Sequence, residues 1–278
     1  MKKMLSMALA ALMAGAMFVG CADQPSNSGT GDTASKDTGS TASPSAVTIT
    51  SKEDLNGKKL GVQAGTTGEA WCNENAADAK VSSYKSGMDA ALDLKNGRLD
   101  AVVIDELPAN SIVAQNDDLM VIDLNFEPEE YAIPVKKGNT ELLESINKTI
   151  ARMKEDGTYQ KLVDAFMPAD GNIVIPEDLE LTGDKTLKMG TNAAFHPFEY
   201  VEGTKPVGFD ICMSQEIAKD YGAKLEVVDM AFDSLIGALS SGNIDFIAAG
   251  MSITEEKKKN VDFSEPYYAS KQVVIVKK

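Results

Sequence analysis

The segment that decides the fold of this chain is FDSLIGALSSGNIDFIAAGMSITEEKKKNVDFSEPYY, residues 232–268. Its first apolar residues recur at the spacing of one helix face and predict a short amphipathic helix: Phe232, Leu235, Ile236 and Leu239. The Ser-Gly-Asn sequence at 241–243 ends that helix. The apolar run at 244–249 then predicts a short buried strand.

Polar groups gather directly after this expected strand. Gly250, Ser252 and Thr254 provide bare backbone and two hydroxyls, and residues 257–259 are three consecutive lysines. In an open α/β sheet, ligands bind beyond the carboxyl ends of the strands, which is where these groups fall. Hydroxyls and exposed amides in such a place can hold a small anion such as a carboxylate. The alternative interpretation is a solvated loop with an ordinary run of charge.

A second copy of the same unit lies earlier in the chain. Residues 87–105, GMDAALDLKNGRLDAVVID, again predict a helix, a break at a glycine, an aspartate and an apolar strand. Two such units predict two similar α/β lobes, each offering a strand end to a ligand between them. Asp105 and Gly250 fall at equivalent positions. One lobe therefore offers a carboxylate and the other a pocket of hydroxyls and lysine, which together suit a zwitterion.

Composition excludes several classes of function. The chain has 278 residues, 43% hydrophobic and 25% charged, which suits one large or two small domains. Its net charge of −15 argues against nucleic acid as a partner and against a polybasic membrane patch. The single histidine, His196, excludes a multi-histidine metal site, and we expect no metal and no cofactor. Cys72 and Cys212 lie in different repeat units, so we expect buried free thiols.

The N-terminal residues have the features of an export signal. Residues 1–20 carry two lysines followed by an apolar run, which predicts a signal peptide and is too short to predict a spanning helix. The run ends in Phe-Val-Gly before Cys21, which resembles the lipobox of bacterial lipoproteins and implies that Cys21 carries lipid, palmitate included. The alternative is cleavage by the ordinary signal peptidase. Residues 21–46 contain almost no apolar side chain and predict a disordered tether.

A Gly-Thr loop lies near the start of the expected folded region. A strand is expected at 59–63, and Gly65-Thr66-Thr67-Gly68 lies between it and a segment that can start a helix. Thr66 and Thr67 are thus expected at a helix N-terminus, where free N–H groups and the helix dipole favour an anion. The loop lacks the Gly-Lys-Thr of phosphate loops, so nucleotide binding has only weak support.

The rest of the chain supplies further elements and their connections. We expect a helix from Pro108 and more strands at 119–124, 131–135, 187–191, 225–228 and 272–276. Residues 126–130 are expected to cross between the lobes, and residues 168–186, which are rich in proline, glycine and acids, to form a surface linker.

Together these residues resemble the bacterial extracellular solute-binding proteins of family 3, the amino-acid-binding lipoproteins of ABC importers. The matching segments cover nearly all of residues 51–278: GKKLGVQAGTTGE, NGRLDAVVID, ARMKEDGTYQKLVDAF, GTNAAFHPFEY, VGFDICMSQEIAKDYG, FDSLIGAL, DFIAAGMSIT and NVDFSEPYY. The resemblance implies an α/β, two-lobed periplasmic-binding-protein-like fold of type II. We expect each lobe to be a mostly parallel sheet with helices on both faces, and two crossover strands to form the hinge.

The order of these segments differs from that of the family. The segment like GTNAAFHPFEY begins the family's chains but starts here at Gly190, and the segment like TYQKLVDAF ends them but finishes here at Phe166. The resemblance therefore implies a circularly permuted member. Residues 47–125 and 272–278 would form the smaller lobe and residues 131–268 the larger. Residues 126–130 and 268–271 would form the hinge strands.

Positions that match the family's pattern imply a binding site of nine residues: Asn192, Phe195, Phe232, Gly250, Ser252, Lys257, Thr66, Thr67 and Asp105. The two phenylalanines match aromatics that stack on the ligand's side chain, and the asparagine matches the residue that contacts its tip. The glycine carbonyl and the aspartate would hold the α-ammonium. Ser252, the Thr67 backbone amide and Lys257 would hold the α-carboxylate. Lys257 stands where the family has arginine, whose planar fork pairs a carboxylate bidentately.

Several of these residues also have a structural interpretation. Phe195 and Phe232 suit an apolar core, and Asp105 suits the cap of a helix beginning near Pro108. Lys257 suits a solvated surface among its lysine neighbours.

We expect a lipid-anchored, monomeric protein on the outer side of the cell membrane that binds an amino acid and delivers it to an ABC permease, without catalysis. Glutamine or another polar amino acid is favoured, because Asn192 argues against a strongly cationic side chain. Two alternatives stay open. One is a ligand-sensing lipoprotein without a transport role, and the other is a dehydratase-like enzyme on the same fold, with His196 as its only imidazole.

Overall fold

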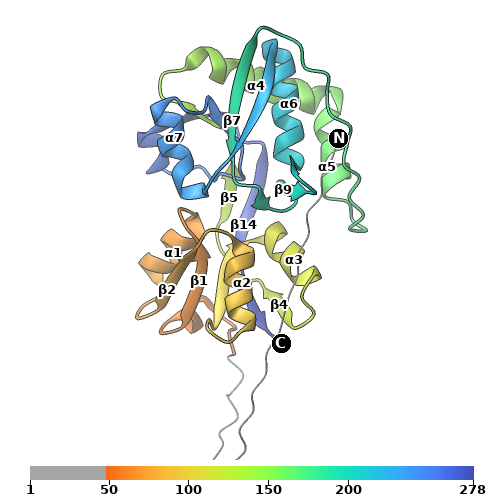
Figure 1. The fold of residues 1–278 in the computed structure, drawn as a ribbon. Coiled ribbons are helices and arrows are strands. Elements are labelled where there is room, and N and C mark those ends of the chain that lie inside the picture. The colour runs from red at the N-terminus through yellow and green to blue at the C-terminus, as the bar shows by residue number, and fades with distance from the viewer. Residues whose placement is uncertain (1–47) are drawn as a thin grey trace, which may run out of the picture. The chain divides into compact units, whose positions relative to one another are not determined.

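The computed structural model describes residues 48–278, and residues 46–278 form one compact unit. The expectations for the signal peptide, the lipidated Cys21 and the tether lie outside the described residues. The described residues build two main sheets with helices around them (Figure 1). None of the helices within residues 48–278 has the length and apolar character to cross a membrane.

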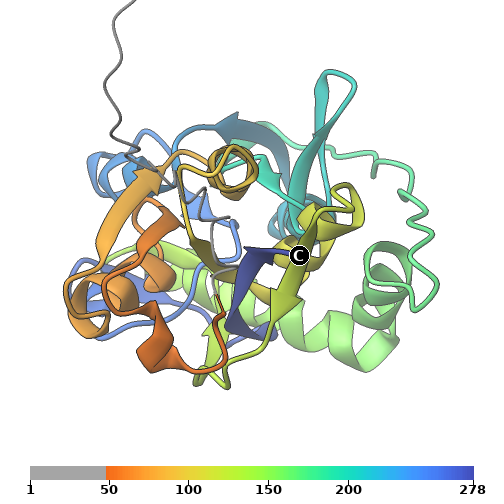
Figure 2. The ribbon, with the colours of Figure 1, turned by 90° about the horizontal axis from the view of Figure 1, so that it is seen from below.

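One sheet, which with its helices we call the smaller lobe, joins strands from both ends of the described chain. Its order is β2-β1-β3-β14-β4, with β1 (Lys59–Gln63), β2 (Lys80–Tyr84), β3 (Ala101–Asp105), β4 (Leu119–Ile122) and β14 (Tyr268–Lys277). β1 is parallel to β2 and β3, whereas β14 is antiparallel to β3 and β4. Figure 2 shows the dark-blue β14 beside the yellow-green β4.

Helices cover both faces of this sheet: α1 (Thr67–Asn75), α2 (Gly87–Lys95) and α3 (Glu106–Ala114), after a 3-10 turn at Lys52–Leu55. Successive side chains of β3 point to opposite faces, so all five of its residues are buried. Ala101 and Val103 pack with Cys72 of α1, while Val102 and Ile104 pack with residues of α2 and α3. An apolar strand without polar alternation is therefore what this sheet requires.

The other sheet, with its helices and a small hairpin sheet, we call the larger lobe. Its order is β11-β7-β12-β6-β13, with β6 (Pro134–Lys136), β7 (Lys185–Thr191), β11 (Ala223–Asp229), β12 (Phe246–Ile247) and β13 (Val261–Phe263). The helices are α4 (Thr140–Asp156), α5 (Thr158–Phe166), α6 (Phe209–Tyr221) and α7 (Leu235–Ser241), with 3-10 turns at Phe232–Ser234 and Lys257–Lys259. The hairpin sheet consists of β8 (Ala194–Phe195), β9 (Glu199–Glu202) and β10 (Lys205–Val207).

Two paired strands connect the lobes. β5 (Pro128–Tyr131) is antiparallel to the first part of β14, from Tyr268 opposite Tyr131 to Lys271 opposite Pro128 (Figure 1). The single strand expected at 131–135 is thus wrong, because the chain passes here from β5 to the other sheet and is divided into β5 and β6. Between them the N–H of Ile133 bonds to the Ser264 hydroxyl at 2.9 Å.

Three further expectations concern the strand directions, the start of the helix near Pro108 and the two cysteines. The sheets are mixed rather than mostly parallel, because β14 enters the smaller lobe, and β6 the larger, from the hinge side. The helix expected from Pro108 begins at Glu106, and Pro108 falls in the first turn, where a missing N–H breaks no helical bond. Cys72 and Cys212 are free, as expected, although Cys212 is only partly buried.

The described chain begins and ends in the smaller lobe. Ile49 is buried in its core, and the Lys278 N–H donates to the Asp118 carbonyl at 3.0 Å. The strand expected at 272–276 is confirmed as the inner part of β14. Between α5 and β7, residues 168–184 form neither helix nor strand, and the last two residues of the segment 168–186 begin β7.

Candidate functional site

Residues of both lobes enclose one small cavity. Its lining includes eight of the nine residues expected from the sequence: Thr66, Thr67, Asp105, Phe195, Phe232, Gly250, Ser252 and Lys257. Gln63, Glu199 and Ala249 complete the lining. The cavity's volume is ≈ 10 Å³, which is about one water molecule. Four of the lining residues also border an adjoining outer pocket of ≈ 550 Å³: Thr66, Thr67, Phe232 and Lys257.

Direct hydrogen bonds join the lobes across this cleft. Gln63 Nε2 donates to Asn192 Oδ1 at 2.9 Å, from the end of β1 to the end of β7. On another side, the Ser111 hydroxyl of α3 lies 2.8 Å from His196 Nδ1. An amino acid is far larger than ≈ 10 Å³, so the lobes must separate before one can enter the inner cavity.

Asp105 lies at the carboxyl end of β3, where the strand points into the cavity. Its Oδ1 accepts a hydrogen bond from the Tyr131 hydroxyl at 2.5 Å, and the Ser270 hydroxyl lies 3.4 Å away. Burial, and secondarily the charge of Glu129, raise the pKa of Asp105 from 3.8 to about 7. Asp105 precedes α3, but its side chain makes no capping bond, so the helix-cap interpretation is wrong. A cation beside this carboxylate would restore its ionised form.

The side-chain hydroxyls of Thr67 and Ser252 both donate to a carboxylate of the protein itself. Thr67 Oγ1 donates to Glu129 Oε2 at 2.7 Å, and Ser252 Oγ donates to the same oxygen at 2.5 Å. Thr67 is the first residue of α1, and Thr66 caps that helix by accepting from the Glu69 N–H at 3.2 Å. Two lobes therefore converge on one carboxylate oxygen supplied by the hinge.

Lys257 provides the cation at this end of the cavity. Its Nζ donates to the Ser252 carbonyl at 3.2 Å and lies 5.8 Å from the centre of the Phe232 ring. Burial lowers the pKa of Lys257, while the negative charges of Glu129 and Asp105 act in the opposite direction. The solvated-surface interpretation is thus wrong for this lysine, although its neighbours Lys258 and Lys259 are exposed.

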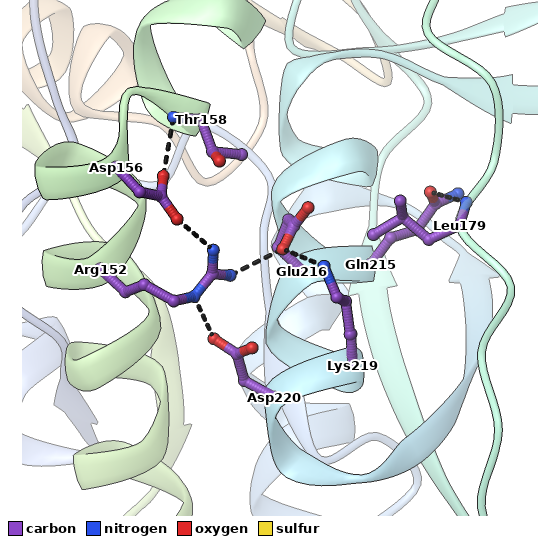
Figure 3. A network of polar contacts seen from close by, with 8 residues as sticks. All are labelled: Arg152, Asp156, Thr158, Leu179, Gln215, Glu216, Lys219 and Asp220. Atoms are coloured by element: carbon purple, nitrogen blue, oxygen red, sulfur yellow. Dashed lines mark hydrogen bonds and ion pairs between the residues drawn. The ribbon is translucent and has the colours of Figure 1, made fainter.

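Neither arginine of the sequence is available to replace it. Arg152 of α4 bonds to three carboxylates within the larger lobe, those of Asp156, Glu216 and Asp220, at 2.6–2.8 Å (Figure 3). Arg98 pairs with Asp93 at 2.7 Å beyond the end of α2. Neither lines the cavity, so a carboxylate there would be held by a point charge and hydroxyls rather than by a guanidinium fork.

Gly250 must be a glycine for two reasons. Its φ of +54° is in the left-handed region, and a Cβ would approach Phe195 Cε1 to 2.7 Å. Its N–H donates to Asp210 Oδ2 at 2.9 Å, which fixes the loop after β12 against α6. Phe195 and Phe232, only 6% and 8% exposed, belong to apolar clusters and also line the cavity. For these two rings the core and site interpretations both hold.

Asn192 does not reach the cavity wall. Its side chain accepts from Gln63 and donates to the Met230 carbonyl at 2.8 Å, so both ends of the amide are engaged. Gln63 lines the cavity in its place, with its Oε1 buried and without a hydrogen-bond partner among the described residues. The sequence contained a signal for Gln63, because it ends the buried strand β1 and strand ends point to ligands in such sheets.

Glu199 of β9 is the most deeply buried acid of the cavity. It is 0% exposed, and neither of its carboxyl oxygens has a hydrogen-bond partner among residues 48–278. Burial, followed by the nearby charge of Asp210, raises the pKa of Glu199 well above 4.5. Asp210 keeps its charge more easily, because the Gly250 N–H and the Tyr267 hydroxyl donate to its Oδ2. No periodic pattern pointed to Glu199, which is one acid in an otherwise aromatic segment.

We expect Glu199→Gln to change the pH dependence of stability. The folded protein keeps this carboxyl protonated above pH 4.5, whereas the unfolded chain ionises it, so the wild type loses stability as pH rises. Relative to the wild type, the variant should gain about 1.4 kcal/mol for each pH unit above 4.5 until the folded group ionises. Thermal unfolding from pH 4.5 to 8 measures this slope, with the exposed Glu202→Gln as the matched control. Parallel curves for wild type and Glu199→Gln would show that the acid is ionised in the fold.

Comparison with known proteins identifies the family of this chain. The sequence profile of the "Bacterial extracellular solute-binding proteins, family 3" matches residues 27–169 and 187–278. The chain is 47% identical to the arginine-binding extracellular protein ArtP of Bacillus subtilis (strain 168), over 35% of this chain and 38% of that protein. It is 39% identical to the L-cystine-binding protein TcyJ of Escherichia coli (strain K12), over 44% of this chain and 47% of that protein. The chain thus spans less than half of the length of these relatives.

Solved structures give matches of similarly short extent. A structure described as an ancestral arginine-binding protein bound to arginine is 51% identical and covers 32% of this chain and 39% of that chain, with a TM-score of 0.30. The arginine-bound form of domain 1 from TmArgBP is 42% identical and covers 34% of this chain and 80% of that chain, also with a TM-score of 0.30.

Proposed function

The chain belongs to the bacterial extracellular solute-binding proteins, family 3, and we propose that it binds an amino acid in the cleft between its lobes. The observation that carries the proposal is the separation of charge around one cavity. Asp105 stands at one end with its pKa raised by burial, and Thr67, Ser252 and Lys257 stand at the other. This arrangement complements an α-ammonium and an α-carboxylate. The names of the relatives, which are an arginine-binding and an L-cystine-binding protein, support the same class of ligand.

We favour glutamine or another neutral polar amino acid. Two uncharged amides lie at the cavity, Gln63 on its wall and Asn192 hydrogen-bonded behind it. An amide offers both a donor and an acceptor, which suits a polar side chain without net charge. Because Asn192 is already engaged, Gln63 is the amide that would contact the ligand.

The biological setting of the proposal is import. A lipid-anchored protein outside the cell membrane, acting as a monomer, would close on its ligand and pass it to an ABC permease. We propose no catalysis, since His196 does not line the cavity and instead contacts Ser111. A sensing role without transport remains the alternative, and the presence of permease and ATPase genes beside this gene would distinguish the two.

We propose in addition that the chain is a circularly permuted member of its family. The family profile matches two separate segments, and the gap between them, residues 170–186, has no helix or strand before β7 begins at Lys185. In this view residues 47–125 and 272–278 form one domain and residues 131–268 the other. A gene that joins Lys278 to Ser51 through a few residues and opens the chain within 170–186 should then fold and bind the same amino acid. Doubling a loop's length costs only about 0.6 kcal/mol. An insoluble product would count against the permutation.

The ligand proposal is tested by thermal unfolding in the presence of each of the twenty amino acids and L-cystine. At a hundredfold excess over Kd, a bound amino acid adds about 2.7 kcal/mol to the free energy of unfolding. We expect a shift with at least one polar amino acid, glutamine first. If no compound shifts the transition, the chain does not bind an amino acid.

A further inference from the structure

Glu129 of the hinge strand β5 lies at the end of the cavity that is expected to hold a carboxylate. Its Oε2 accepts hydrogen bonds from Thr67 of the smaller lobe and from Ser252 of the larger lobe, at 2.7 and 2.5 Å. Both hydroxyls line the inner cavity. Glu129 therefore connects three parts of the molecule, the two lobes and the hinge, through one oxygen atom.

These contacts exclude a second carboxylate from the same hydroxyls. A serine or threonine hydroxyl has one proton to donate, so a hydroxyl that donates to Glu129 cannot donate to a ligand. Hydrogen bonds to an ionised acceptor are also about twice as strong as neutral ones. The remaining volume of ≈ 10 Å³ confirms that no other carboxylate fits beside Glu129 while the lobes are in this position.

The surroundings of Glu129 offer its side chain a second place. Glu129 and Thr67 both border another pocket, of ≈ 240 Å³, which is lined by residues of the smaller lobe and of the hinge. Lys52 borders the same pocket, with its Nζ 5.0 Å from the centre of the Phe126 ring. A rotation of the half-buried side chain would thus bring its carboxylate into a space bordered by Lys52 and by two other acids, Glu74 and Glu127.

We propose that Glu129 is an internal competitor for the ligand's carboxylate. Its bonds to Thr67 and Ser252 hold the two lobes together. An amino acid binds when its own carboxylate takes those hydroxyls and Glu129 leaves them. This inference rests on the proposed function and adds to it a residue that sets the affinity. We call the two hydrogen bonds from Thr67 and Ser252 to Glu129 the clasp, and only molecules in which the clasp is open can bind the ligand. Apparent affinity falls in proportion to the fraction of binding-competent protein. A clasp formed in about 90–99% of molecules therefore weakens binding about 10- to 100-fold.

The test is the affinity of Glu129→Ala and Glu129→Gln for L-glutamine and L-arginine, measured by calorimetry. We expect Glu129→Ala to bind about 10- to 100-fold more tightly than the wild type. Glu129→Gln keeps an acceptor oxygen but not its charge, so its gain should be smaller. The matched control is Glu130→Ala, the same charge removed from the next residue of β5, whose side chain is exposed. The control should bind like the wild type.

A second readout follows the closed state itself. Small-angle scattering of the unliganded protein should show a larger radius of gyration for Glu129→Ala than for wild type and Glu130→Ala, since the clasp is lost. Unchanged affinity in Glu129→Ala would overturn the inference while leaving the proposed function intact. Weaker affinity would also overturn it, by assigning Glu129 to the ligand's ammonium together with Asp105. Absence of binding by the wild type and all variants, across the full amino-acid screen, would remove both proposals.

Discussion

Asp105→Ala should abolish amino-acid binding. The ammonium of the ligand would lose the buried carboxylate at the end of β3 that lines the cavity. Removing one partner of a buried charge pair costs on the order of 2–5 kcal/mol, which is roughly a 30-fold loss at the least. Calorimetry with the amino acid that shifts the melting transition measures the effect. Asp117→Ala, which removes an exposed carboxylate of the same lobe, is the control and should bind normally.

The pH dependence of wild-type binding gives an independent measure of the same contact. Asp105 must be ionised to hold an ammonium, and burial raises its pKa to about 7. Affinity should therefore be greatest above pH 7 and fall about tenfold for each pH unit below it. Any residual binding by Asp105→Ala should lack this dependence. A tenfold loss or less in the variant, together with a flat pH profile in the wild type, would remove Asp105 from the site.

Deleting residues 271–278 should unfold the smaller lobe. These residues are most of β14, the strand hydrogen-bonded between β3 and β4. Alternate side chains of a strand face opposite sides, and from the sequence only part of Val273–Val276 is expected in one core. In the structure all four are at most 4% exposed, because apolar clusters cover both faces.

The expected loss is comparable to the stability of a whole domain. Burial of four aliphatic side chains contributes about 6–12 kcal/mol, against about 5–15 kcal/mol for the total stability of a typical domain. Circular dichroism and amide hydrogen exchange should show a folded larger lobe and an unprotected smaller one. Removal of Lys277 and Lys278 alone, both exposed, should leave the fold intact. A truncated protein that keeps its affinity and its exchange protection would contradict the central role of β14.

The sequence predicted those parts of the molecule that follow from local pattern and topology. Asp105 and Ser252 follow buried strands, and strand ends of an open sheet face one cleft, so their meeting could be anticipated. Glu129 could not be anticipated in this way. It lies in a short hinge strand whose side-chain directions depend on its pairing with β14, about 140 residues later in the chain. For Asn192 the sequence predicted a contact with the ligand that the structure does not provide. Its side-chain amide is hydrogen-bonded to Gln63 and to the Met230 carbonyl. These partners come from distant parts of the chain, so only tertiary packing determines them.

Both ends of the described chain lie in the smaller lobe, and this determines how the protein could be built into a sensor. Two fluorophores attached near Ile49 and Lys278 would both be fixed to the smaller lobe. The distance between them would therefore stay constant when the lobes close. A useful pair needs its second member on the larger lobe. Within the segment 168–183, which has no helix or strand, an inserted reporter should avoid Val174, Asp178 and Leu179, because these residues hydrogen-bond to α5 and α6. For the same reason, immobilising the protein through Lys278 would leave β5, the cleft and the larger lobe free to move.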